Sequence, residues 1–195
     1  MEESYEVEVK LPLTDKEEMK QRILQAGGFE LNSELQKDIY YDHPCRSFSE
    51  TDEAVRIRHR TRTEGPTITE SRHAPVELTY KGPKIDKKTK TRIEYTVNLE
   101  EEGMESMIQV LLNTGFKHVA KVVKNREFFD IDGITASLDA VTDVGSYIEF
   151  ELMAEGKEGM KVARSRILKI VKTLGLEERD MVRESYLEIY LQNTS

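Results

Sequence analysis

The sequence predicts an α+β protein built on a closed antiparallel β-barrel, with a charged interior and helices packed on the outside. Two observations lead to this expectation. Several short segments alternate apolar and charged residues, which is the pattern of strands that bury one face. Charged residues make up 34% of the 195 residues, against 37% hydrophobic residues, so much of the charge needs a structural location. The interior of a barrel would provide one.

The N-terminal half is expected to contain five strands and one helix. The first strand alternates strictly, with Glu6, Glu8 and Lys10 on one face and apolar residues on the other. The helix is capped by Thr14 or Asp15 and runs to about Ala26, before a Gly-Gly pair. The strands cover residues 5–11, 29–41, 54–60, 78–81 and 92–97. Residues 61–74 have no clear period and are expected to form a hairpin loop, and the lysine-rich run 84–90 is expected to be a solvated loop.

The C-terminal half is expected to contain three strands and three helices. The first of these helices, Glu100–Asn113, has an apolar stripe at helical spacing. An Asp132-Gly133 turn separates the first two strands. The strands cover 116–128, 131–141 and 146–152, and the later helices cover 160–174 and 183–191. No fixed-period repeat and no linker interrupts the sequence, so residues 1–195 are expected to form a single domain.

Composition and charge exclude several classes of protein. The net charge of -8 argues against general nucleic-acid binding, which needs an excess of basic residues on one face. Cys45 is the only cysteine, so an intrachain disulfide and a Cys-rich metal site are both excluded. The N-terminus lacks a signal-peptide core, and no run is long and apolar enough to span a bilayer. We therefore expect a cytoplasmic protein without membrane contact, either a monomer or a homodimer.

The charged faces of the expected strands are sorted by sign. The acidic positions are Glu6, Glu8, Asp139, Glu149 and Glu151, and the basic positions are Arg56, Arg58, Lys81, Arg92, Lys124 and Arg126. Carboxylates at i and i+2 on a strand point the same way, about 7 Å apart, and can converge on one hard cation. Oxygen ligands favour Mg²⁺ or Mn²⁺ over zinc. The arginines and lysines are typical partners of phosphate oxygens.

A simpler interpretation exists for each pair taken alone. Glu6 with Glu8, or Arg56 with Arg58, could lie on a solvated strand face. Arg92 beside Glu94 could be a cross-strand salt-bridge partner. The hypothesis of a converging site therefore depends on the recurrence of these pairs on strands of one sheet.

The same residues resemble the signature of the CYTH, or triphosphate-tunnel, superfamily. The chain opens with Glu6-x-Glu8-x-Lys10, and six further matches follow in order. They are Ala54-Val-Arg56-Ile-Arg58, Thr79-Tyr-Lys81-Gly-Pro83, Arg92-x-Glu94, Lys124-x-Arg126, Leu138-Asp139-x-Val141 and Ile148-Glu149-x-Glu151. Within this superfamily the sequence looks most like the class IV adenylyl cyclase group. That resemblance implies an eight-stranded antiparallel barrel with a polar tunnel.

The resemblance also implies roles for individual residues. Asp139, Glu149 and Glu151 would bind one Mg²⁺ or Mn²⁺ ion, and Glu6 and Glu8 a second. The triphosphate would be held by Lys10, Arg56, Arg58, Lys81, Arg92, Lys124 and Arg126. Lys10, Glu149 and Glu151 would form the catalytic set, and Glu94 would orient neighbouring bases.

Three functions remain open at this point. A cyclase would convert ATP into cAMP and pyrophosphate, whereas a triphosphatase would release orthophosphate from inorganic triphosphate, thiamine triphosphate or a nucleotide. A noncatalytic binder of organic polyphosphates would need mainly the basic residues. The substrate is in every case a nucleotide or other triphosphate. Tyr41, residues 61–74 and Tyr186 are the candidates for recognising its organic part at the tunnel mouth.

Overall fold

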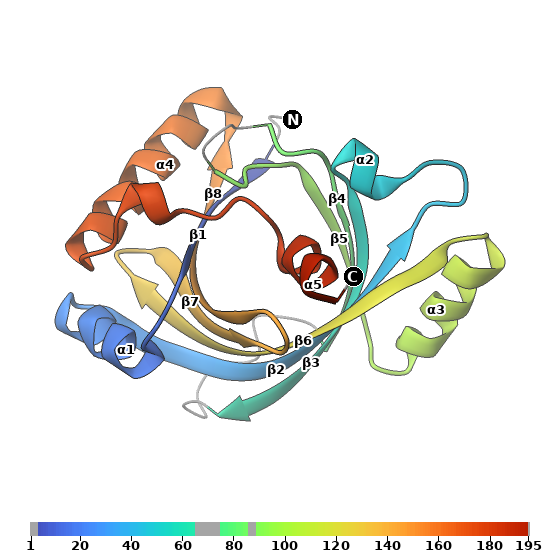
Figure 1. Cartoon of the computed structure of the whole chain (residues 1–195), viewed down its shortest axis with the longest axis horizontal. Coiled ribbons are helices and arrows are strands. Elements are labelled where there is room, and N and C mark those ends of the chain that lie inside the picture. The colour runs from blue at the N-terminus through green and yellow to red at the C-terminus, as the bar shows by residue number, and fades with distance from the viewer. Residues whose placement is uncertain (1–3, 65–74, 86–88, 195) are drawn as a thin grey trace.

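One curled, eight-stranded antiparallel sheet forms the centre of the molecule in the computed structural model, which describes residues 4–64, 75–85 and 89–194 (Figure 1). The strand order is β1-β8-β7-β6-β2-β3-β4-β5. The strands are β1 (Ser4–Pro12), β2 (Phe29–Asp42), β3 (Ala54–Glu64), β4 (Val76–Lys81), β5 (Glu94–Leu99), β6 (Lys117–Ile131), β7 (Ile134–Val141) and β8 (Gly145–Glu155). The expected α+β class and eight-stranded antiparallel sheet are confirmed.

The two edges of the sheet, β1 and β5, meet through the segment that precedes β5. Glu6 forms an isolated antiparallel bridge with Arg92, and the backbone N–H of Lys90 donates to the carbonyl of Glu8 at 3.0 Å. Among the described residues, this short connection takes the place of a regular β1–β5 ladder. The sheet therefore encloses a tunnel that one irregular segment closes.

Helices cover the outer face of the sheet, because that face carries the apolar half of each alternating strand. Helices α1 (Lys16–Gln25) and α4 (Gly156–Thr173) pack on β1, β7 and β8, where Val9, Phe150 and Ile167 are among the buried residues. On the opposite side, α3 (Gly103–Asn113) packs on a second cluster that contains Ile57 and Leu111. These two apolar clusters thus lie outside the curled sheet, which leaves the charged faces of the strands inside.

The C-terminal helix α5 (Tyr186–Thr194) differs from the other helices because it lies within the curve of the sheet (Figure 1). Its first residue, Tyr186, packs against Tyr40, Val122 and Val141. A short helix α2 (Phe48–Thr51) and a 3-10 turn η1 (Glu178–Asp180) complete the described elements. None of the described helices is both long and apolar enough to cross a membrane.

Several element boundaries differ from the expected ones. Residues 61–64 continue β3 instead of belonging to a hairpin loop, and the remainder of that loop, 65–74, lies outside the described residues. The strand expected over 131–141 begins only at Ile134, after the turn. The strand expected from Arg92 begins at Glu94, and α4 begins at Gly156, four residues earlier than expected. Helix α2 was not predicted.

The last helix begins at Tyr186 and not at Arg183, because Ser185 caps it. The N–H of Glu188 donates to the Ser185 hydroxyl at 3.2 Å, and the N–H of Ser185 donates to the Glu188 carboxylate at 2.6 Å. This reciprocal pair is a capping box. Upstream, the N–H of Val182 donates to the carbonyl of Lys10 at 2.8 Å, which ties the preceding residues to β1.

Candidate active site in the tunnel

The tunnel contains a cavity of about 480 Å³ whose lining is rich in charged side chains. Ten of the expected site residues line it: Glu6, Glu8, Arg56, Arg58, Lys81, Arg92, Lys124, Arg126, Glu149 and Glu151. They come from five strands and from the segment before β5. On the strands, alternation directs these side chains inward, because the residues immediately before and after each of them point outward, where the outer helices pack. The structure thus brings these ten residues to one cavity.

Two expected residues, Lys10 and Asp139, are not among the residues that line this cavity. Lys10 is 1% exposed and Asp139 is fully buried. The Lys10 ammonium donates to the backbone carbonyl of Glu184 and lies 4.3 Å from the centre of the Tyr186 ring. Burial lowers the pKa of Lys10 to about 8. These contacts place Lys10 between β1 and the C-terminal segment.

Three carboxylates form an acidic cluster on adjacent strands, and we define this cluster as Glu6, Glu8 and Glu151. One oxygen from each lies within 4.8 Å of the others. The cluster follows from the register of the sheet, in which Glu8 stands directly opposite Glu151 on β8. Burial raises the pKa of Glu6 to about 8, and burial together with the charge of Glu149 raises that of Glu8 to about 7. A nearby cation would relieve this repulsion.

The acidic cluster fits a magnesium or manganese ion. Its donors are oxygens only, they converge, and their negative charge is incompletely balanced, all of which suit a hard divalent cation. The cluster does not follow the expected grouping, in which Asp139, Glu149 and Glu151 share one ion. It unites Glu151 with the pair from β1.

Asp139 and Glu149 are engaged by Arg126. The Arg126 Nε donates to Asp139 Oδ1 at 2.6 Å, and its Nη2 contacts both Asp139 and Glu149. The Tyr186 hydroxyl also donates to Asp139, at 2.7 Å. A carboxylate that accepts three such hydrogen bonds is well satisfied. Asp139 therefore orients Arg126 and Tyr186 in this structure.

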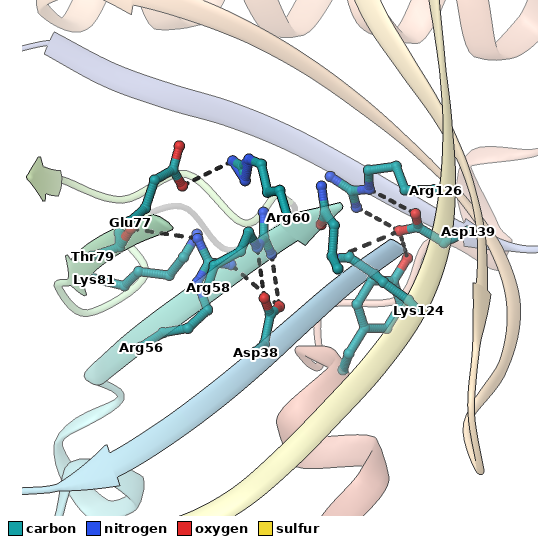
Figure 2. Close-up of polar contacts among 12 residues, drawn as sticks. Asp38, Arg56, Arg58, Arg60, Glu77, Thr79, Lys81, Lys124, Arg126 and Asp139 are labelled. Carbon is teal, nitrogen blue, oxygen red and sulfur yellow. Dashed lines mark hydrogen bonds and ion pairs between the residues drawn. The ribbon is translucent and has the colours of Figure 1, made fainter. Parts of the chain in front are cut away.

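The basic wall lies on β3 and β6, and its Arg126 also reaches Glu151 of the acidic cluster at 3.4 Å. Arg58 forms a bidentate pair with Asp38, with distances of 2.6 and 2.7 Å (Figure 2). Arg56 lies 3.6 Å from the same carboxylate. Burial, with the charges of Arg126 and Arg58, lowers the pKa of Lys124 to about 7. A positive charge this disfavoured gains from an anion in the tunnel.

Lys81 and Arg92 stand at the side of the tunnel near β5. Lys81 forms an ion pair with Glu94, its register partner on β5. Burial acts to raise the pKa of Glu94, but the combined attraction of Lys81, Arg56 and Arg92 holds that pKa below its usual value. Arg92 lies 3.9 Å from Asp52. The expectation that Glu94 orients a neighbouring base agrees with this geometry.

Asp38, Lys90 and Arg60 belong to the tunnel although the sequence interpretation did not include them in the site. The expectation of a solvated loop was wrong for Lys90, which is 8% exposed and forms ion pairs with Glu8 and with Glu149, the latter at 3.3 Å. Lys84 is also mostly buried and pairs with Asp52 at 2.6 Å, whereas residues 86–88 lie outside the described part. The sequence held one indication, because Lys90 precedes Arg92 by two residues, and residues at this spacing in an extended segment point the same way.

Two of the three candidates for recognising the organic part of a substrate line the cavity. Tyr41 and Tyr186 both line the cavity, together with Phe48, Leu187 and Leu191. Tyr41 and Phe48 belong to the apolar cluster under α3, whereas Tyr186 and Leu187 belong to the cluster inside the curve of the sheet. Residues 65–74 of the third candidate lie outside the described residues.

Comparison with known proteins agrees with this geometry. The family described as the CYTH domain matches residues 4–186. A protein of Methanocaldococcus jannaschii named "Putative adenylate cyclase MJ0240" is 34% identical over 184 residues, which is 94% of this chain and 97% of that protein. The PH1819 protein of Pyrococcus horikoshii is 39% identical, with a TM-score of 0.83 over 96% of this chain and 98% of that chain.

A more distant structure shares the fold. It is HpAC1 from Hippeastrum, described as a "putative adenylyl cyclase" with a dominant triphosphatase activity. It is 15% identical, with a TM-score of 0.63 over 97% of this chain and 95% of that chain. Because the family match spans nearly the whole sequence, this chain belongs to the CYTH domain family.

Proposed function

We propose that this protein is a divalent-metal-dependent enzyme that holds a triphosphate in its tunnel and converts ATP into cAMP and pyrophosphate. One observation carries the proposal. A cluster of converging carboxylates faces a wall of buried arginines and lysines across a single cavity. Phosphoryl transfer depends mainly on positioning and on charge neutralisation, and this arrangement supplies both.

The residue roles follow from the geometry. Glu6, Glu8 and Glu151 would hold an Mg²⁺ or Mn²⁺ ion, which when bound supplies charge stabilisation to the reacting phosphate. A second ion would depend on Glu149, because Asp139 is fully buried and bound by Arg126 and Tyr186. The phosphate oxygens would be bound by the bases that line the cavity, namely Arg56, Arg58, Lys81, Arg92, Lys124 and Arg126. Lys10 would position Tyr186, because its ammonium lies behind the cavity wall.

In the proposed reaction the ribose 3′-hydroxyl oxygen attacks the α-phosphorus. The bond between that phosphorus and the oxygen that bridges it to the β-phosphorus breaks, and pyrophosphate leaves. The hydroxyl proton passes to a carboxylate of the acidic cluster. The apolar side chains that line the cavity, among them Tyr41 and Leu187, would receive the adenosine part. The relative named as an adenylate cyclase supports this choice.

A second candidate is a triphosphatase, in which water attacks the terminal phosphorus and orthophosphate is released. The same tunnel residues would hold its substrate, because both reactions act on a bound triphosphate. The activity described for HpAC1 is consistent with this candidate. A noncatalytic binder is the third candidate, but the acidic cluster exceeds what binding alone requires.

Product identification separates these functions. The purified protein is incubated with ATP, inorganic triphosphate and thiamine triphosphate, each with Mg²⁺ and with Mn²⁺, and every product is identified. We expect cAMP and pyrophosphate from ATP. Orthophosphate with ADP would refute the cyclase and support the hydrolase. Metal-dependent binding without any product would support the binder.

A matched pair of variants tests the site. Glu151→Gln removes one charge from the acidic cluster and should abolish turnover while the circular dichroism spectrum is unchanged. Glu155→Gln on the same strand is the control, because Glu155 is exposed, and it should keep full activity. Equal activity in both variants would contradict the proposed metal position.

A further inference from the structure

Arg60 is a buried tunnel arginine whose hydrogen-bonding capacity is largely unused. It follows Arg58 by two residues on the inward face of β3, its side chain is 8% exposed, and it lines the tunnel cavity. Its Nη2 donates to Glu77 at 2.8 Å (Figure 2). Its Nε and Nη1 are buried and have no hydrogen-bond partner among the described residues. The nearest acid to Nε is Glu34, at 3.8 Å, which is beyond hydrogen-bonding distance.

Arg58, the preceding arginine on the same face, has a carboxylate partner for its guanidinium, whereas the Nε and Nη1 atoms of Arg60 have none. Arg58 is neutralised by both oxygens of Asp38. Glu77 holds Arg60 by one nitrogen only, which leaves the other two free to receive acceptor oxygens. Buried donors without acceptors are rare in folded proteins, and a planar guanidinium edge matches the oxygens of a phosphate. Burial and the charges of Arg58 and Arg56 also lower the pKa of Arg60 to about 10, so an anion would be favourable there.

The length of the arginine row indicates the kind of anion. Arg56, Arg58 and Arg60 occupy every second position of one strand, so the row spans about 13 Å at about 3.4 Å per residue. A triphosphate is shorter than this row, and Arg56 and Arg58 suffice to contact it. The third arginine therefore lies past the end of a triphosphate bound by the first two.

The tunnel cavity itself reaches Arg60. Arg60 and Glu77 line the same cavity as Arg56 and Arg58. An elongated anion bound along the arginine row can thus reach Arg60 without leaving this cavity.

We propose that Arg60 binds a further phosphate of a linear inorganic polyphosphate, so that the tunnel takes chains of four or more phosphates. This inference rests on the proposed function, because it places three phosphates against Arg56, Arg58 and the other bases. The added phosphate would accept hydrogen bonds from the Nε and Nη1 atoms of Arg60. Glu77 would keep the guanidinium oriented.

Chain-length dependence of binding tests the proposal. Titration calorimetry of the full chain with tripolyphosphate and tetrapolyphosphate is done in EDTA, which prevents metal-dependent turnover. Wild-type protein should bind tetrapolyphosphate at least about fivefold more tightly, and Arg60→Gln should remove this gain while changing tripolyphosphate affinity by less than about twofold. Arg60→Lys, which keeps the charge but not the flat edge, should lose part of the gain. Arg179→Gln is the control for net charge, because Arg179 is exposed.

Three results would overturn the proposal. They are equal affinity of wild-type protein for the two chains, equal weakening of both chains by Arg60→Gln, and a gain that survives Arg60→Gln. Wild-type protein that binds tripolyphosphate neither in EDTA nor with Mn²⁺ would instead contradict the proposed function. Arg56→Gln should weaken both chains, which separates the two failures. A thermal melt of each variant verifies that it is folded. If Arg60→Gln does not fold, the comparison of the two chains is made with Arg60→Lys instead.

Discussion

Replacing Asp38 by Asn should destabilise the protein strongly and at the same time improve phosphate binding. Asp38 is 2% exposed and accepts two hydrogen bonds from Arg58, at 2.6 and 2.7 Å. Burial alone would raise the pKa of Asp38, but the charges of Arg58 and Arg56 hold it well below its usual range. The carboxylate is therefore ionised, and its removal leaves a buried guanidinium without its counter-charge.

The size of the effect follows from this burial. Breaking a buried ion pair by removing one partner costs about 3–5 kcal/mol. For a chain of 195 residues, each kcal/mol shifts Tm by about 2–4 °C, so Asp38→Asn should lower Tm by roughly 6–20 °C. The freed Arg58 fork can bind phosphate instead. Tripolyphosphate should consequently raise Tm more in Asp38→Asn than in wild-type protein.

Thermal denaturation followed by circular dichroism measures both effects. Asp180→Asn serves as the control, because Asp180 is exposed, and its Tm should stay within about 2 °C of wild type. Adding Arg58→Met to Asp38→Asn should recover part of the lost stability, since the unpaired charge of Arg58 is then removed. A loss of less than about 3 °C in Asp38→Asn would refute the reasoning, as would a double variant less stable than Asp38→Asn alone.

Three further predictions concern the acidic side of the tunnel and the C-terminal helix. Burial raises the pKa of Glu6 to about 8 and of Glu8 to about 7, from a usual value of 4.5. The folded protein therefore keeps protons that the unfolded chain has released, and stability in EDTA should fall between pH 5 and 6.5; a Tm that rises over this range would contradict the assignment. Lys90→Met removes a positive charge from the acidic cluster and should strengthen Mn²⁺ binding at least about fivefold by titration calorimetry, whereas weaker binding would show that Lys90 orients Glu8. Tyr186→Phe deletes a buried hydrogen bond to a carboxylate and should cost about 1.5–3 kcal/mol in urea denaturation, while an unchanged midpoint would show that the hydroxyl is dispensable.

Much of the fold was predictable from local patterns. The strict alternation of residues 5–11 determines which side chains share a face of β1, and the Asp132-Gly133 turn marks the hairpin between β6 and β7. These features depend only on near neighbours in the chain. The start of α5 was predicted less well, because its capping box competes with the helical pattern that begins at Arg183.

The closure of the sheet was not readable from local patterns. Lys90 contacts Glu8 across 82 positions of sequence, and no periodicity in residues 84–90 indicates such a contact. A lysine-rich run is usually solvated, and only the curvature of the sheet brings this one to the inside.

The sequence by itself determined the sign of the charge at each inward position, because alternation assigns every strand residue to one of two faces. Tertiary structure alone decided which of those charges meet. Glu151 joins Glu6 and Glu8 through the β1–β8 register, and Arg126 takes Asp139 and Glu149 because β6 and β8 flank β7. Alternation specifies a direction, whereas partners across a barrel depend on register and curvature, which arise only when distant strands pair.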